Sequence, residues 1–135
     1  MPIRSLLAAF ALLIGVAAPV APVLASGGSP LVTTEWLEKN LDDPRVRVIE
    51  VSVEPGVFER GHIPNAQNVV WHTDLVETVT RDIASPEKFQ ALARRLGVDR
   101  DTTVVLYGDN NNWFAAWGAW VFAQYGLVDN VKLLD

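Results

Sequence analysis

The chain has 135 residues, 50% of them hydrophobic, and carries a formal net charge of −5. That length fits a single domain. The acidic balance argues against a nucleic-acid-binding protein, because such binding depends on Lys and Arg contacts to phosphate. With no Cys and only two isolated His, the chain has neither disulfides nor the ligand spacing of a metal site. We therefore expect a packed core, no metal and no other cofactor.

Residues 1–25 have the features of a secretory signal peptide. Arg4 supplies a positive start, residues 6–20 are apolar, and residues 23–25 end in a small-residue cleavage site. An uncleaved membrane anchor is the alternative, but two prolines cut the uninterrupted apolar helix below the roughly 20 residues that span a bilayer. We expect cleavage, with no stable membrane span afterwards and a periplasmic or secreted product. Removing Arg4 leaves 10 basic and 16 acidic residues, a charge of −6.

After a flexible lead-in at residues 26–30, helical and strand patterns alternate along the chain. Ser85 and Pro86 suit the cap and first turn of a helix that stops at Gly97. The β-branched runs suit strands, and the most apolar of them suits a strand covered on both faces. Helices are predicted over residues 31–41, 86–96 and 113–125, and strands over residues 46–53, 68–71, 103–107 and 131–134. This alternation predicts an α/β domain with a mainly parallel sheet.

The last predicted strand lies at the very end of the chain. A parallel sheet needs cover on both faces, and no helix follows this strand to supply it. We therefore expect the domain, residues 31–135, to be incomplete at its C-terminus.

Residues 58–69, with the sequence FERGHIPNAQNV, form the most informative segment of the chain. Within it, residues 61–66 read as a loop between two strands, in which Pro64 fixes φ and Asn65 can adopt the left-handed conformation. His62 can hydrogen-bond backbone groups of this loop. We expect His62 to be structural and not a catalytic base, because a lone His needs a partner nucleophile or orienting group. An ordinary turn is the alternative interpretation.

The loop after the strand at residues 103–107 begins with Gly108 and Asp109 and continues with three Asn residues. An Asp at the N-terminus of a helix acts as a cap. Its negative charge would also repel an anionic ligand. An inactive strand-to-helix turn is therefore the favoured interpretation.

Four aromatic residues cluster in the helix predicted over residues 113–125, and Trp113 and Phe114 open it. The helix is apolar nearly all round and so expected to be buried. Trp117 and Trp120 have the spacing of core residues. For Trp113 and Phe114, core packing and an interface with another domain remain equally open, because aromatic residues serve both roles.

Residues 58–66 resemble the rhodanese signature, in which an aromatic residue precedes a His-aliphatic-Pro-Gly-Ala core; Asn65 stands at the Gly position. Three further segments follow the same family in order and spacing, at residues 31–37, 101–107 and 110–116, and so do the closing residues. Single motifs of this kind are weak, but agreement over about a hundred residues is specific. The chain resembles the first, Cys-less domain of a tandem-domain thiosulfate sulfurtransferase.

This resemblance implies a three-layer domain with no catalytic residue of its own. In the family, a Cys in the second domain takes sulfur from thiosulfate as a persulfide and passes it to cyanide or another thiophilic acceptor. Here the Cys position falls on Gly108 or Asp109, neither of which can carry sulfur. The resemblance further implies that a second rhodanese domain is the partner and that Trp113 and Phe114 line the pocket or the interdomain contact. It makes the following residues a structural signature: Phe58, Gly61, His62, Pro64 and Ala66.

A stand-alone, Cys-less rhodanese-like module that binds a partner or an anion is the alternative function. A phosphatase of the related Cys-loop type is disfavoured, because it requires the same missing Cys.

Overall fold

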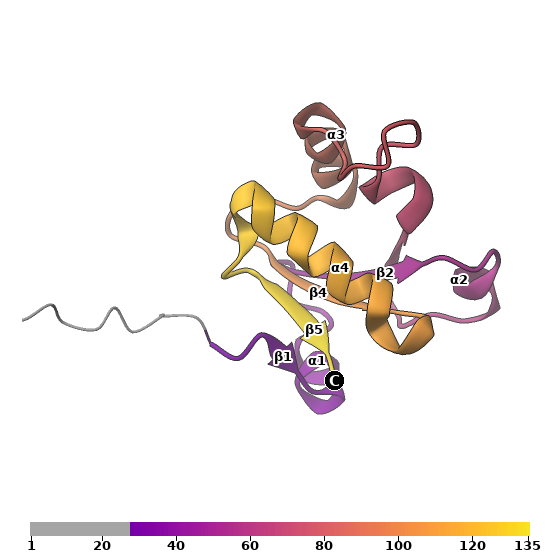
Figure 1. Cartoon of the computed structure of the whole chain (residues 1–135). Helices are drawn as coiled ribbons and strands as arrows, with labels where there is room; N and C mark the ends of the chain where they lie inside the picture. The colour runs from indigo at the N-terminus through magenta and orange to yellow at the C-terminus, as the bar shows by residue number, and fades with distance from the viewer. Residues whose placement is uncertain (1–27) are drawn as a thin grey trace, which may run out of the picture.

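The computed structural model describes residues 28–135 (Figure 1). The predicted signal peptide, residues 1–25, lies outside the described residues. The described part contains five strands, at β1 (Leu31–Val32), β2 (Val46–Ser52), β3 (Gln67–Val70), β4 (Thr103–Gly108) and β5 (Val131–Leu134). Its α-helices are α1 (Thr34–Asn40), α2 (Val57–Arg60), α3 (Pro86–Leu96) and α4 (Trp113–Phe122).

The strands form one sheet in the order β1-β5-β4-β2-β3, and every pair of neighbouring strands is parallel. This confirms the predicted α/β domain with a parallel sheet flanked by helices. Side chains alternate between the two faces of each strand, so β2 and β4 each contribute to two separate cores.

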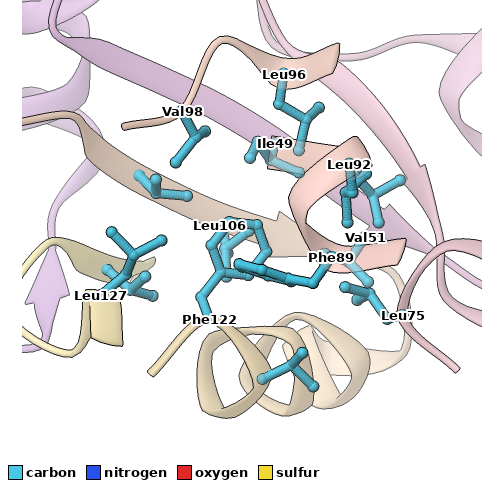
Figure 2. Packing of buried hydrophobic residues seen from close by; sticks show 14 of the residues in the cluster. Ile49, Val51, Leu75, Phe89, Leu92, Leu96, Val98, Leu106, Phe122 and Leu127 are labelled. Atoms are coloured by element: carbon cyan, nitrogen blue, oxygen red, sulfur yellow. The ribbon is translucent and has the colours of Figure 1, made fainter. Parts of the chain in front are cut away.

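The larger core lies between the sheet and the helices α3 and α4 (Figure 2). At its centre, Phe122 of α4 lies close to Phe89 of α3, with ring centroids 5.0 Å apart in an edge-on arrangement. Ile49 and Val51 of β2 fill the sheet side and are fully buried. The smaller core lies on the opposite face, where Leu37 of α1 packs against β2 and β4. The domain therefore has three layers.

The helix α3 has the predicted bounds because both of its ends carry local capping groups. The Ser85 hydroxyl accepts a hydrogen bond from the Lys88 N–H at 3.4 Å, and Pro86 occupies the first turn. Gly97 adopts a φ of 65° and ends the helix.

The helix predicted over residues 31–41 is shorter in the structure. Its first two residues instead form β1, which pairs with the end of β5. The helix then starts at Thr34, and the Thr33 hydroxyl caps it by accepting from the Trp36 N–H at 3.2 Å. A two-residue strand has too few residues for an alternating pattern, so only its distant partner reveals it.

Two other segments differ from the predicted elements. The short helix α2 has no counterpart among the predicted elements, and it precedes the signature loop, residues 61–66. The helix predicted over residues 113–125 ends as α4 at Phe122 and continues as a π-helical turn, Ala123–Leu127, which contains Gly126 at a φ of 86°. Among residues 28–135, no helix is long and apolar enough to cross a membrane.

Candidate functional site

The carboxyl ends of β2 and β4 lie side by side near the middle of the sheet, where Val51 pairs with Gly108. The connection after β2 leads to the signature loop, whose Ile63 and Ala66 pack on the α1 face. The connection after β4 leads to α4 on the opposite face. In parallel α/β sheets, the crevice between connections that diverge in this way is the usual place for a ligand. We therefore take the residues that follow these two strands as the candidate site.

Gly108 leaves no space for a side chain. A Cβ atom built on it would lie 2.1 Å from the backbone oxygen of Val51. That contact is with backbone, so it cannot be relieved by turning a side chain. The Gly108 N–H is already used, donating to Oδ1 of Asn112 at 2.8 Å. This position can therefore carry a Cys only if the β2–β4 pair moves apart.

Asp109 stands at the N-cap position of the helical turn Asn110–Asn112, but its side chain makes no capping hydrogen bond, contrary to the prediction. Its Oδ2 accepts hydrogen bonds from two consecutive backbone N–H groups, Val53 at 3.2 Å and Glu54 at 3.0 Å. The turn formed by Asn110–Asn112 separates Asp109 from the first residue of α4, so its side chain reaches the connection after β2 instead. The other oxygen, Oδ1, is buried and has no hydrogen-bond partner among the described residues.

The three Asn residues after Asp109 all have positive φ, at 51°, 55° and 61°. Asn tolerates the left-handed region better than other residues with a Cβ, although three in a row store strain. Asn112 stabilises the turn because its side chain bonds at both ends. It accepts from Gly108, and its Nδ2 donates to the backbone oxygen of Leu134 at 2.9 Å. The turn is thus tied to the ends of both β4 and β5.

Trp113 and Phe114 occupy different environments at the start of α4. Trp113 is 73% exposed. Phe114 packs edge-on against Trp71, with ring centroids 5.0 Å apart. Trp117 contacts the same ring, but Trp120 is 49% exposed. The prediction that α4 is buried is therefore wrong on one side of the helix, where Trp113, Ala116 and Trp120 are exposed.

The signature loop is held by its own His. Nδ1 of His62 donates to the backbone oxygen of Phe58 at 2.9 Å, and the two rings stack with centroids 3.7 Å apart. Asn65 has a φ of 65°, the left-handed conformation expected of it. The His62 side chain thus bonds a backbone group of its own segment.

Sequence reasoning missed a polar pair beside the signature loop, formed by the buried Glu50 and the half-buried Tyr107. Glu50 is only 2% exposed, and its Oε1 has no hydrogen-bond partner among the described residues. Tyr107 pairs with it across β2 and β4. The Tyr107 hydroxyl accepts from the Ile63 N–H at 3.0 Å. Burial, together with the Glu50 carboxylate, raises the pKa of Tyr107 above its usual value. The alternation along β2 was the signal that could have identified Glu50, since it places this residue on a covered face of an interior strand.

A pocket of about 360 Å³ lies beside the ends of β2 and β3. Its polar lining includes Ser52, whose hydroxyl donates to Oδ1 of Asn68 at 3.0 Å. Val53 and Glu54 also line it, together with His72. In the part of the chain that the structure describes, no group of His, Asp and Glu is arranged to hold a metal ion.

The profile of the rhodanese-like domain matches residues 33–135, and the chain belongs to this family. This confirms the resemblance drawn from the signature segment. The chain is 48% identical over 105 residues to the sulfur carrier protein TtuD of Thermus thermophilus, an alignment that covers 78% of this chain and 36% of that protein. It is 44% identical over 105 residues to a putative thiosulfate sulfurtransferase of Mycolicibacterium smegmatis, covering 78% of this chain and 38% of the relative.

The solved structures agree with this assignment. The crystal structure of YnjE superposes with a TM-score of 0.69 at 28% identity, over 78% of this chain and 27% of that one. SseA of Escherichia coli, described as a 3-mercaptopyruvate sulfotransferase with the rhodanese fold, superposes with a TM-score of 0.66 at 25% identity, over 79% and 45%. The chain thus spans less than half the length of each of these relatives.

Proposed function

We propose that this chain is the non-catalytic rhodanese domain of a two-domain thiosulfate sulfurtransferase. In that enzyme, a thiolate of the second domain attacks the outer sulfur of thiosulfate, forms the S–S bond of a persulfide and releases sulfite. Cyanide or a thiol then takes the outer sulfur, and the thiolate is restored. The present chain supplies a rigid partner for the second domain and part of the wall of its pocket.

One observation carries the proposal: the position that holds the nucleophilic Cys in catalytic rhodanese domains has no space for a side chain in this chain. The chain contains no Cys, and Gly108 has a backbone oxygen where a Cβ would stand. The neighbouring Asp109 is an acid whose carboxylate is already bonded to backbone N–H groups. Sulfane sulfur transfer needs a thiolate, so in this enzyme the thiolate belongs to another domain. The relatives named as sulfurtransferases are more than twice as long as the matched segment, which supports such a domain.

The exposed end of α4 supports the contact with that domain. Trp113 follows the Asp109 loop and leaves a large aromatic side chain 73% exposed. Aromatic residues are enriched at protein interfaces, and an isolated exposed Trp at the carboxyl edge of the sheet suits one. Phe114 supports this contact indirectly, because its ring packs on Trp71 and so fixes the start of α4. We further propose that residues 1–25 direct export, which makes the enzyme periplasmic or secreted.

An assay for thiocyanate formation from thiosulfate and cyanide tests the catalytic part of the proposal. The chain of 135 residues should give no more thiocyanate than a buffer blank. The native polypeptide that includes a second rhodanese domain should be active, and replacement of the Cys in that domain by Ser should abolish the activity. Turnover by the Cys-less chain alone would contradict the proposal.

The native reading frame provides the second test. We expect it to encode, beyond codon 135, another rhodanese domain with a Cys after its corresponding strand. A frame without such a domain would favour the stand-alone binding module instead.

A further inference from the structure

We propose that the backbone N–H groups of Val53 and Glu54 form a binding site for small oxyanions, which Asp109 holds closed with its own carboxylate. This inference goes beyond the proposed function and requires no second domain. It assigns a role to a carboxylate that joins the two connections at the middle of the sheet.

The hydrogen bonds of Asp109 are those of a bound anion. A single oxygen, Oδ2, accepts from both consecutive N–H groups, at 3.2 and 3.0 Å. No ion pair within residues 28–135 includes Asp109. Its charge is therefore balanced by backbone dipoles and not by a cationic side chain. Successive backbone N–H groups directed at one point are a common way to bind phosphate and similar anions.

The first of the two N–H groups adjoins the sheet. Val53 directly follows β2, whose end is paired with β4 on one side and β3 on the other. The turn after β4 is fixed separately by the two hydrogen bonds of the Asn112 side chain. Removal of the Asp109 carboxylate therefore leaves the Val53 N–H next to the paired end of β2, together with the Glu54 N–H and the volume that the carboxylate filled.

The surroundings define the class of ligand. Two donors converging on one oxygen suit a small oxyanion such as thiosulfate or sulfate. Val53 and Glu54 also line the pocket of about 360 Å³ beside the ends of β2 and β3. Glu54 and Glu59 line the same pocket, and their negative charges oppose a negative ion. We therefore expect weak binding once the site is open, and a closed site that keeps thiosulfate away from a domain with no thiol.

Asp109→Ala, Asp109→Asn and the unchanged chain test this proposal in thermal unfolding. Tm is measured in sodium thiosulfate and in sodium chloride of equal ionic strength. Thiosulfate, like sulfate, is expected to stabilise proteins in general, so the change in Tm of each variant is compared with that of the unchanged chain. The Ala variant should gain a saturable rise in Tm of about 3 °C or more in thiosulfate. The unchanged chain should gain none beyond the general salt effect. The Asn variant should behave like the unchanged chain, because its amide oxygen still accepts from the N–H groups of Val53 and Glu54.

Amide NMR locates the effect. Thiosulfate should shift the Val53 and Glu54 amide resonances of the Ala variant and leave them unmoved in the unchanged chain. A folded Ala variant that responds to thiosulfate no more than the unchanged chain would overturn the proposal. So would an Asn variant that binds thiosulfate as well as the Ala variant does.

The same variants remain informative if Asp109→Ala does not fold in chloride. Refolding in thiosulfate, together with a thiosulfate-dependent shift of the Val53 and Glu54 amide resonances, would then support the proposal, because the free ion replaces the missing carboxylate. An Ala variant that stays unfolded in both salts, beside a folded Asn variant, would show that the contact is only structural and would reject the site. None of these measurements depends on thiocyanate formation, so their failure is separable from failure of the proposed sulfurtransferase role.

Discussion

The hydroxyl oxygen of Tyr107 accepts a hydrogen bond from the backbone N–H of Ile63 at 3.0 Å, which joins β4 to the signature loop. Glu50 lies beside Tyr107 on the same face of the sheet. Since the Tyr107 oxygen is the acceptor from Ile63, its own proton remains free to face the Glu50 carboxylate. The signature loop is thus anchored by the half-buried Tyr107 hydroxyl beside the buried Glu50, and not only by apolar packing.

Tyr107→Phe should lower the free energy of unfolding by about 1–2 kcal/mol, because the Ile63 N–H loses its acceptor. Urea unfolding measures the loss, and hydrogen exchange locates it: the Ile63 amide should exchange faster. Tyr125→Phe is the matched control, since it removes the other tyrosine hydroxyl, which bonds the Ala84 backbone oxygen. Unchanged exchange at Ile63 in Tyr107→Phe would refute the anchoring role.

Alkaline pH should destabilise the fold through both tyrosines. Burial is the main cause that raises the pKa of Tyr107 and of Tyr125, and nearby carboxylates add to it. In the unfolded chain each hydroxyl titrates near its ordinary pKa of about 10. A folded pKa above the unfolded one gives stability that is complete below pH 10 and declines as the pH rises beyond it.

Urea midpoints measured from neutral pH to above pH 10 check this expectation. Each single Tyr→Phe variant should flatten the alkaline decline in part, and the double variant should flatten it most. The chain has only these two tyrosines. A double variant with the full alkaline decline would assign the effect to other groups.

The sequence predicted elements whose determinants are local. The helix α3 has its capping Ser85, its Pro86 and its Gly97 within a few residues of each end, and its bounds were correct. The strand β4 was identified from its apolar run, with one residue missed at its end. The φ of Asn65 was likewise predictable, because the preference belongs to the residue itself.

Features that depend on distant partners were not predictable from one sequence. Leu31 becomes a strand residue only because it pairs with Leu133. Asp109 had a plausible local partner, the following helix, and instead bonds to Val53 and Glu54, more than fifty residues earlier. The obstruction at Gly108 depends on the register between two strands and is invisible in either strand alone.

Asn65 tests how far the signature tolerates a residue other than Gly. Asn65→Ala should lower the free energy of unfolding by about 1 kcal/mol, because Ala is less able to hold a φ of 65°. Asn65→Gly should change it by less than about 0.5 kcal/mol, since Gly adopts this φ without strain but adds freedom to the unfolded chain. Chemical denaturation of the two variants side by side measures the difference. Equal stability of the Ala and Gly variants would contradict a conformational role.

Restoring a Cys at Gly108 should not create an enzyme. The new Cβ would meet the Val51 oxygen, so Gly108→Cys should be destabilised by about 3 kcal/mol and make no thiocyanate. Gly108→Ala is the control, because it adds the same Cβ without sulfur and should be destabilised by a similar amount. A Gly108→Cys protein as stable as the unchanged chain would show that the strands can separate at little cost. Rapid thiocyanate release by it would contradict the closed nucleophile position.

Trp113 should matter for the two-domain enzyme more than for the fold. Because its side chain is 73% exposed, Trp113→Ala should change the free energy of unfolding of the present chain by less than about 0.5 kcal/mol. Trp117→Ala is the contrasting variant. Trp117 packs on Trp71 with ring centroids 5.4 Å apart, so its removal should be destabilising by about 3 kcal/mol.

In the native enzyme with its second domain, Trp113→Ala should lower kcat/KM for thiosulfate by about tenfold, the effect of losing one central aromatic contact. Steady-state kinetics of that enzyme decide the matter: a kcat/KM equal to that of the unchanged enzyme would remove Trp113 from the interdomain contact and leave it an ordinary surface residue.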